Sequence, residues 1–325
     1  MPLGEFDIIK QYFQRDKSQP GVALGIGDDC ALVGFTDNKY LALTVDTLVT
    51  DNHFPANAAA ADIASRALCV NLSDLAAMGA TPLWFTLSLS LPAADQVWLA
   101  EFSRGLFAVA DRFHCQLVGG DTTRGPLSIT IQAQGSVPID HYLTRAGAQI
   151  GDRIFVTGSL GDGAAALAMI RSQLTLDEQQ ADYLYRRFYQ PEPQLMAAQK
   201  LLGISRTAID ISDGLLADLG HIASASQVAM VIDIDHLPLS PVLHRLYQQQ
   251  PQRVQQWALT GGDDYQLAFT VPTEKLPVVK ELIATGELEA TEIGVVTSGR
   301  GVECRLKGKV YHYDFEKGYQ HFVST

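Results

Sequence analysis

The chain has 325 residues, more than one hydrophobic core usually supports, so we expect two domains of roughly 150 residues each. Apolar residues make up 47% and charged residues 18%, which is typical of a globular protein. The net charge of −12 argues against broad contacts with nucleic acid or an anionic membrane, so neither is an expected partner.

The first half predicts a strand, a long helix, a second helix and further strands. Residues 40–50 alternate, which places Thr44 and Asp46 on one face of a strand. A helix is expected over 57–79, with Asn57 as its N-cap and Gly79 just past its last turn. The elements expected next are a strand at 83–91, a helix at 94–114, a strand at 115–118 running into Gly119-Gly120-Asp121, and a strand at 128–137.

The second half begins after residues 138–152, whose turn residues show little periodicity. We place the domain junction there, with domains at 1–138 and 139–325. A strand at 153–157, a glycine turn at 158–163 and a helix to 170 follow, an order that can offer backbone N–H groups to an anion. Further on, a strand at 208–213 precedes a helix at 214–224, and a glycine pair precedes two acids at 261–264.

Other residue types give little indication of chemistry. The four cysteines are scattered without a CxxC pair, so buried, reduced thiols are expected. The N-terminus is acidic, and the apolar stretches fall short of the ~20 residues that cross a bilayer, which predicts a cytoplasmic protein. His53 is as consistent with an exposed loop as with a substrate contact, and the aromatic segment 315–322 can stack a ring or simply pin the chain end.

Asp74 is the most informative acid, because it continues the helical stripe of Ile63, Ala67 and Val70, which should be buried. Burying a carboxylate costs several kcal/mol unless it is paired or bound to a metal. A salt bridge to Arg66 is one alternative and a metal ion is the other.

Seven carboxylates lie in loops or near element ends, and few basic residues lie nearby. No lysine occurs between Lys39 and Lys200, or between Lys200 and Lys275. Alone, Asp28 and Asp29 are explained by a solvated turn, and Asp46, Asp121 and Asp210 by capping a turn. If the acids converge, oxygen ligands without a His or Cys cluster favour Mg²⁺, and Mg²⁺ in turn suggests phosphates. The acids are Asp28, Asp29, Asp46, Asp74, Asp121, Asp210 and Asp213.

These motifs, taken in order, resemble those of the thiamine-monophosphate kinases almost from end to end. The matching segments are GIGDDCA at 25–31, TVDTLVTDNHF at 44–54, VNLSDLAAMGA at 70–80, GGDTTRGP at 119–126, LTRAGA at 143–148, DISDGL at 210–215, GGDDYQL at 261–267 and KGYQHF at 317–322. The wider superfamily, with aminoimidazole ribonucleotide synthetase and selenophosphate synthetase, shares the acid and glycine motifs more loosely.

The resemblance implies transfer of the γ-phosphoryl group of ATP to thiamine monophosphate, in two α/β domains, with the N-terminal sheets of a homodimer pairing in a barrel-like interface. It implies Mg²⁺ ligands at Asp29, Thr44, Asp46, Asp74, Asp121, Asp210 and Asp213. It implies ATP contacts at Gly120, Asp121, Arg145 and Ser212, and substrate contacts at His53, Asp263 and Tyr319, with Asp28 secondary.

Two positions depart from the family pattern. Val45 replaces a hydroxyl residue, so only its backbone carbonyl could serve a metal there. The family usually has GGED where this chain has GGDD, so Asp263 is one methylene shorter and could act through a water.

The acceptor is a phosphate oxygen that is already anionic, so no general base and no covalent nucleophile are expected, and transfer should be direct and in line. One alternative is another synthetase of the superfamily, although a selenophosphate synthetase needs a reactive Cys beside a Lys, and no such pair precedes Asp28. A catalytically silent nucleotide and Mg²⁺ binding protein is the other.

Overall fold

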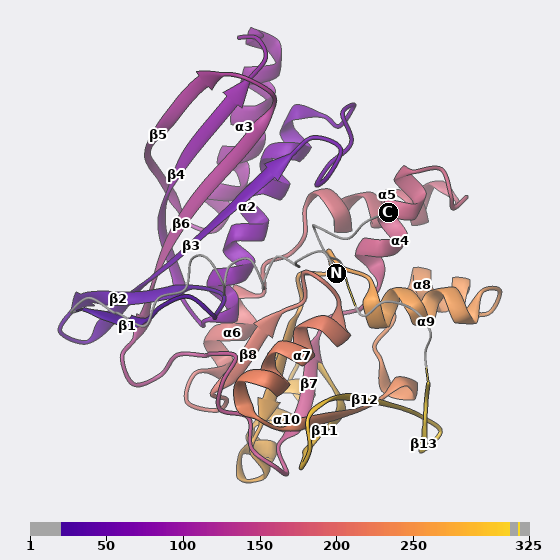
Figure 1. The fold of residues 1–325 in the computed structure, drawn as a ribbon. Helices are drawn as coiled ribbons and strands as arrows, with labels where there is room; N and C mark the ends of the chain where they lie inside the picture. Colours follow the sequence, from indigo (N-terminus) through magenta and orange to yellow (C-terminus); the bar gives the residue numbers. More distant parts are fainter. Residues whose placement is uncertain (1–20, 313–317, 319–325) are drawn as a thin grey trace, which may run out of the picture.

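The computed structural model describes residues 21–312 and residue 318. It confirms the predicted α/β class, because it contains two units, each built on its own sheet, that meet along one long helix, α2 (Figure 1). Among the described residues, no helix is both long and apolar enough to cross a membrane.

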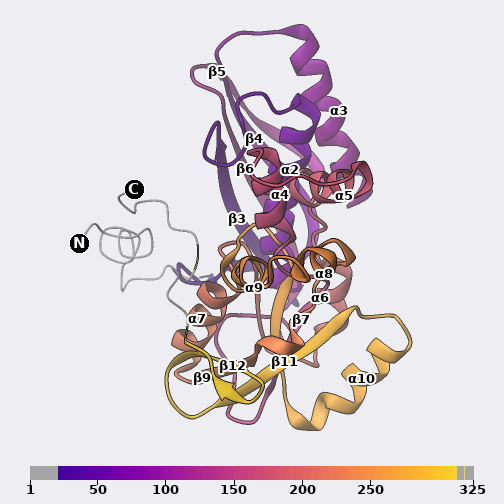
Figure 2. The same cartoon turned by 90° about the vertical axis from the view of Figure 1, so that its right-hand side faces the viewer.

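The N-terminal unit is a six-stranded sheet in the order β1-β2-β3-β6-β4-β5. Strands β3 and β6 pair antiparallel along their whole lengths, while β4 and β5 are parallel. Helices α2 and α3 cover one face, and no helix of the described residues covers the other (Figures 1 and 2). The strands are β1 (Val22–Leu24), β2 (Ala31–Thr36), β3 (Lys39–Val49), β4 (Thr81–Leu91), β5 (Gln116–Arg124) and β6 (Ser128–Pro138).

Both predicted helices of this unit are present, as α2 (Ala60–Ala77) and α3 (Gln96–Arg112). The start predicted for α2 was three residues early, because residues 55–58 form a turn in which the Ala58 N–H donates to the Pro55 carbonyl. Gly79 follows α2 with a φ of +71°, as expected for a glycine that ends a helix. The side chain of Asp95 caps α3 by accepting from Val97 N–H at 2.8 Å.

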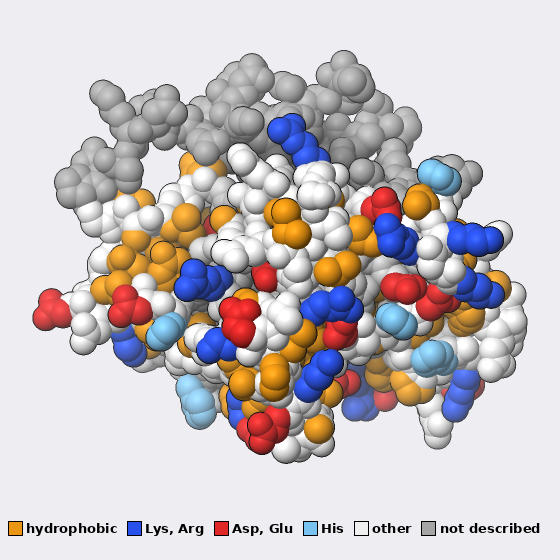
Figure 3. Space-filling view, turned by 90° about the horizontal axis from the view of Figure 1, so that it is seen from below, with side chains coloured by type: hydrophobic (Ala, Val, Ile, Leu, Met, Phe, Trp, Pro, Cys, Tyr) orange, Lys and Arg blue, Asp and Glu red, His pale blue; other side chains and the backbone are white. Residues whose placement is uncertain are grey.

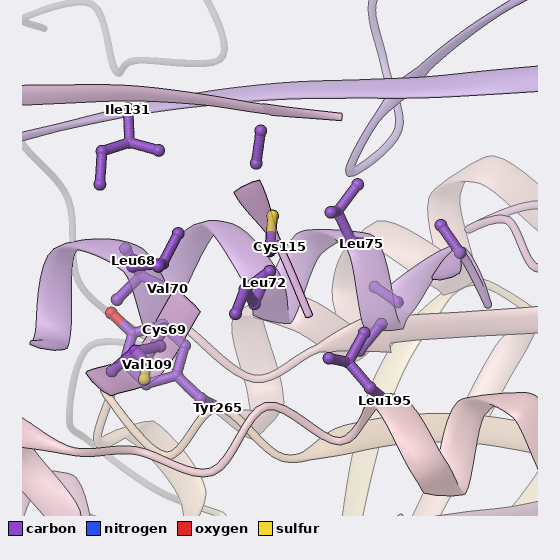
Figure 4. Packing of buried hydrophobic residues seen from close by; sticks show 14 of the residues in the cluster. Leu68, Cys69, Val70, Leu72, Leu75, Val109, Cys115, Ile131, Leu195 and Tyr265 are labelled. Carbon is purple, nitrogen blue, oxygen red and sulfur yellow. The ribbon is translucent and has the colours of Figure 1, made fainter. Parts of the chain in front are cut away.

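Helix α2 is buried on nearly every side. The sheet lies against one side of it and elements of the C-terminal unit lie against another, so Ile131 of β6 and Leu195 of α6 lie on opposite sides of the helix (Figure 4). One hydrophobic cluster accordingly runs from the sheet through α2 into the C-terminal unit. A helix in this position holds its polar residues at fixed places between the two units.

The C-terminal unit is a seven-stranded sheet in the order β13-β12-β9-β11-β7-β10-β8, with helices around it. Its strands are β7 (Arg153–Thr157), β8 (Thr207–Asp210), β9 (Ala229–Asp233), β10 (Leu267–Val271), β11 (Ala290–Thr297), β12 (Gly301–Leu306) and β13 (Lys309–Val310). Its helices are α4 (Asp162–Ile170), α5 (Glu178–Tyr189), α6 (Leu195–Leu201), α7 (Leu215–Ser226), α8 (Pro241–Tyr247), α9 (Pro251–Thr260) and α10 (Leu276–Ala284), with short 3-10 turns η2 (Ile234–His236) and η3 (Thr273–Lys275).

The end predicted for the strand at 115–118 was wrong. Gly119-Gly120-Asp121 lies inside β5, which continues to Arg124. The glycine serves close approach of two strands and not a turn: a Cβ on Gly120 would lie 1.8 Å from the Leu87 carbonyl oxygen, and its φ is +148°.

The two sheets take their strands from either side of residues 139–152, which form no helix and no extended strand. Within the described residues of one chain, neither sheet closes into a barrel. The barrel-like interface therefore concerns a second copy of the chain and stays a prediction.

Candidate functional site

Three of the predicted metal ligands converge where the two units meet. Asp29 precedes β2, Asp74 lies in the last turn of α2, and Asp210 is the last residue of β8. One carboxylate oxygen from each lies within 4.8 Å of the other two. The fold thus brings together three acids that are separated by 45 and 136 residues in the chain.

Hydroxyl groups and one arginine fix the orientation of these carboxylates. Thr44 of β3 donates to Asp74, and Ser73 donates to Asp210 at 2.7 Å. Arg145 forms an ion pair with Asp29 at 2.5 Å. The guanidinium predicted to contact ATP therefore also partly neutralises the acid cluster.

The cluster is electrostatically unfavourable as it stands. Burial, followed by the charges of neighbouring carboxylates, raises the pKa of Asp74 well above its ordinary value and that of Asp210 to about 8. Burial also raises the pKa of Asp29, against the opposing effect of Arg145. Among the described residues, no donor hydrogen-bonds to the buried Oδ2 atom of Asp29. An all-oxygen set that repels itself and leaves a buried lone pair unused fits a hard divalent cation.

A small cavity of about 100 Å³ adjoins the cluster, and three further predicted site residues, Asp46, His53 and Ser212, line it beside Asp74 and Asp210. Asp46 and Thr44 lie on the helix-covered face of β3, while the side chain of Val45 is exposed on the opposite face. The lining residues are Asp46, Thr47, Leu48, His53, Arg66, Val70, Asp74, Asp210, Ser212 and Tyr265.

The remaining acids are arranged around this site. Both carboxylate oxygens of Asp28 accept from the Arg145 N–H, at 3.0 and 3.2 Å, and burial raises its pKa to about 7. Asp213 is half-buried and lies two residues before α7. Burial raises the pKa of Asp218, and the charge of Asp213 is the next largest cause of this rise. The sequence interpretation missed Asp218, although it lies on the apolar helical stripe of Leu215 and Ile222.

Gly120 and Asp121 do not join this cluster within one chain. The strand register aligns Asp46 with Ile131, Ile131 with Leu87, and Leu87 with Gly120. Three strand spacings separate the two ends of this row, about 14 Å. Asp121 is exposed on the edge strand β5.

A larger cavity of about 530 Å³ lies beside the small one, and His53 lines both. It is enclosed by the turn at 51–58, by α4 and by three aromatic residues of α5, namely Tyr185, Phe188 and Tyr189. Asp263 lines it as well, so two of the three predicted substrate contacts face one cavity. Tyr319 lies outside the described residues, although its neighbour Gly318 lies against Asp213 and Ala217.

The two acids of the GGDD segment contact different partners. Asp263 accepts from Arg66, so the predicted alternative of an Arg66–Asp74 salt bridge was wrong: the guanidinium extends to the C-terminal unit and not along its own helix. Asp264 accepts from the N–H groups of Gly161 and Gly163 at 2.6 and 3.0 Å. The glycine turn predicted to bind an anion thus already holds one, a carboxylate of the same chain.

Comparison with known proteins agrees with this arrangement. Residues 27–137 match the N-terminal domain, and residues 149–307 the C-terminal domain, of the AIR synthase related proteins. The chain is 45% identical to the thiamine-monophosphate kinase of Escherichia coli strain K12, and all of both chains is covered.

Two solved structures are also similar. The thiamine-monophosphate kinase of Stenotrophomonas maltophilia K279a is 41% identical with a TM-score of 0.79, covering 96% of this chain and 99% of that one. AaThiL complexed with AMPPCP and TMP is 32% identical with a TM-score of 0.85, covering 98% and 97%.

Proposed function

Because the chain belongs to the thiamine-monophosphate kinase family, we propose that its two cavities are the two halves of one phosphotransferase site. The protein is an enzyme that uses ATP to phosphorylate thiamine monophosphate, which yields thiamine diphosphate and ADP. The AIR synthase related fold alone also occurs in other synthetases, but the full-length identity is to this kinase.

One observation carries the assignment: the acid-lined cavity and the aromatic cavity adjoin at His53. Phosphates belong on the acid side, once cations are bound there. The organic part of thiamine monophosphate, which is cationic and heteroaromatic, suits the walls of the larger cavity, where Tyr185 and Tyr189 offer ring faces and Asp263 offers a carboxylate. His53 lies where the substrate phosphate would pass from one cavity to the other.

Asp29, Asp74 and Asp210 are the residues we propose to hold Mg²⁺, with Thr44 and Asp46 beside them and Asp213 at the rim. Bound Mg²⁺, in several ions per site, supplies charge neutralisation for two polyanions that must approach in line. The protein contributes positioning: Thr44 and Ser73 fix the carboxylates, and Ser212 lines the cavity where the nucleotide phosphates would lie.

Transfer needs no general base, since the acceptor phosphate oxygen is ionised at neutral pH. We therefore propose direct in-line transfer without a phosphorylated side chain. We also propose that Arg145, which pairs with Asp29 in the structure, contacts the nucleotide phosphates.

A homodimer accounts for the position of Gly120 and Asp121. In one chain, three strand spacings, about 14 Å, separate them from Asp46 across the sheet. Their proposed contact with the nucleotide therefore requires β5 of a second copy. The face of the sheet that no helix of the described residues covers presents exposed Phe35, Val45 and Val118, which such a copy would bury.

We propose a separate role for each of the two sheet-containing domains. Residues 1–138 form the ATP, Mg²⁺ and dimer domain, and residues 139–325 complete the site. We place the enzyme in the cytoplasm, without nucleic acid or membrane partners. On the face shown in Figure 3, Lys and Arg side chains are interspersed with Asp and Glu and form no single basic patch.

Chromatography tests the function directly. Purified protein with Mg·ATP and thiamine monophosphate should yield thiamine diphosphate and ADP in equal amounts. Tight binding of nucleotide without product would instead favour a silent binding protein, and a phosphorylated side chain after incubation with ATP alone would rule out direct transfer.

A further inference from the structure

Arg66 is a buried basic residue that the assigned site leaves without a role. It lies in the second turn of α2, and its side chain is only 2% exposed. All three of its nitrogens are engaged: Nε donates to the His53 carbonyl at 3.1 Å, Nη1 to the Phe188 carbonyl at 2.7 Å, and Nη2 to Asp263 Oδ1 at 2.5 Å. One side chain thus joins three segments that enclose the larger cavity.

The guanidinium also packs between aromatic rings. Its central carbon lies 4.1 Å from the centroid of the Phe188 ring and 5.7 Å from that of Tyr265. Burial lowers the pKa of Arg66, but Asp263 and Tyr265 act together against burial, and the pKa of Arg66 is raised above its ordinary value. The planar guanidinium is permanently charged and donates to three separate acceptors, and a lysine ammonium cannot reproduce this arrangement.

Asp263 is oriented through one of its two oxygens. Oδ1 accepts from Arg66 and from the Tyr265 hydroxyl, the latter at 3.0 Å. Among the described residues, no donor bonds to Oδ2, and the side chain is 26% exposed beside the larger cavity. The carboxylate therefore has one oxygen fixed by the protein and one oxygen left for a ligand.

The backbone of this segment also needs support. Asp263 and Tyr265 have φ values of +69° and +50°, a conformation that costs about 1–3 kcal/mol at a residue other than glycine and persists only when surrounding contacts hold it. Two of those contacts are backbone bonds to the loop after β8, from Asp263 N–H to Ser212 O and from Tyr265 N–H to Ile211 O, both at 2.8 Å. The Arg66 ion pair is a third.

We propose that Arg66 and Tyr265 are positioning residues, which hold Asp263 so that its second oxygen faces the organic part of thiamine monophosphate. The inference rests on the proposed function, because it assigns the larger cavity to that substrate. Arg66 also lines the small cavity, but it is buried and each of its nitrogens already has a partner in the protein, so we assign it the role of holding Asp263 and not of binding the substrate. The shorter side chain at Asp263, where the family usually has glutamate, makes this support more important.

The test compares Arg66→Lys and Tyr265→Phe with a matched control. Arg112→Lys is suitable, because Arg112 also links the two units, through an exposed ion pair with Glu192, and neither residue lines either cavity. We expect R66K to raise KM for thiamine monophosphate about tenfold or more, and Y265F about threefold, while kcat and KM for ATP stay within about twofold. R112K should leave all three constants unchanged.

The split between constants separates positioning from loss of fold. A fall in kcat with unchanged KM, or an equal rise of both KM values, would overturn the proposal. If R66K does not fold, Y265F decides, because it removes only a hydroxyl: an unchanged KM for thiamine monophosphate would then count against the inference.

A binding measurement keeps this test independent of turnover. Titration calorimetry with thiamine monophosphate and Mg·AMPPCP should show weaker binding of the first ligand to R66K and unchanged binding of the second. If the wild-type protein makes no thiamine diphosphate, the proposed function fails. If it does, yet R66K binds thiamine monophosphate as tightly as wild type, the positioning inference fails alone.

Discussion

Replacing Asp74 by asparagine tests the electrostatics of the acid cluster, because the change removes a charge and keeps the volume. Two unit charges 4.8 Å apart repel by about 3.5 kcal/mol at an effective dielectric constant of 20. Ionised Asp74 would face two such neighbours, Asp29 and Asp210, for about 7 kcal/mol of repulsion. That is comparable with the whole net stability of a typical domain, about 5–15 kcal/mol.

Without metal, D74N should therefore be at least as stable as wild type. With Mg²⁺, wild type should gain about 2.7 kcal/mol at a hundredfold excess over Kd, which raises Tm by roughly 5–10 °C. D74N should gain little of this. Its turnover should fall about a thousandfold, since losing a cation that stabilises the transferred charge by about 4 kcal/mol costs three powers of ten in rate.

Thermal melting with EDTA and with MgCl₂ measures the first two effects, and a coupled ADP assay measures the third. D111N is the control, because Asp111 is an exposed acid on the neighbouring helix α3, outside the cluster. If D74N keeps activity within a few fold of wild type, or is stabilised by Mg²⁺ as strongly, Asp74 does not hold the cation and the reasoning fails.

Three further outcomes are expected. Gly120→Ala should destabilise the protein by about 2 kcal/mol or more in urea, because its Cβ would overlap a carbonyl of β4, while Gly119→Ala, with nothing within 4 Å, should be tolerated. Burial raises the pKa of Asp264 to about 7, so between pH 4 and 7 the folded state binds more protons than the unfolded state. The free energy of unfolding should therefore fall as pH rises through this range. In EDTA, D264N should reduce this pH dependence by up to about 1.4 kcal/mol per pH unit. If Asp121 acts across a dimer, mixing inactive D121N with inactive D74N should restore about a quarter of wild-type activity, because only mixed dimers hold one intact site; no recovery would place Asp121 in its own chain's site.

The elements of the fold were largely predictable because their periodicity is local. The strand at 153–157 was predicted with its observed ends, and the helix of Asp74 within three residues. The strand at 115–118 was predicted, but its continuation to Arg124 was not, because glycines that allow close strand approach look the same in sequence as glycines of a turn. What distinguished them was the backbone of β4, about 30 residues away in the chain.

The candidate site was predictable by residue type but not by pairing. Asp74 was identified as a buried acid that needed a partner, yet Arg66, one of the partners suggested for it, pairs with Asp263 instead. These two residues are 197 positions apart, and their pairing depends on how the two units pack. The periodicity of the sequence gives no information about that packing. Asp218 and Asp264 were given no role for a related reason: both accept hydrogen bonds from glycine N–H groups, and the sequence does not distinguish such an aspartate from one that binds a metal ion.

The scarcity of lysine gains a physical explanation from these contacts. Had lysines lined the cluster, they would have neutralised Asp29, Asp74 and Asp210 permanently, as Arg145 does in part, and left no driving force for cations. Burial and the neighbouring carboxylates instead favour the protonated forms of Asp74 and Asp210, and they raise the pKa of Asp210 to about 8. Divalent cations must displace those protons, so occupancy should release protons and strengthen as pH rises toward 8. The buried, mutually repelling acids thus destabilise the metal-free fold. Bound cations remove this destabilisation, and the same cations create the phosphate-binding form of the site.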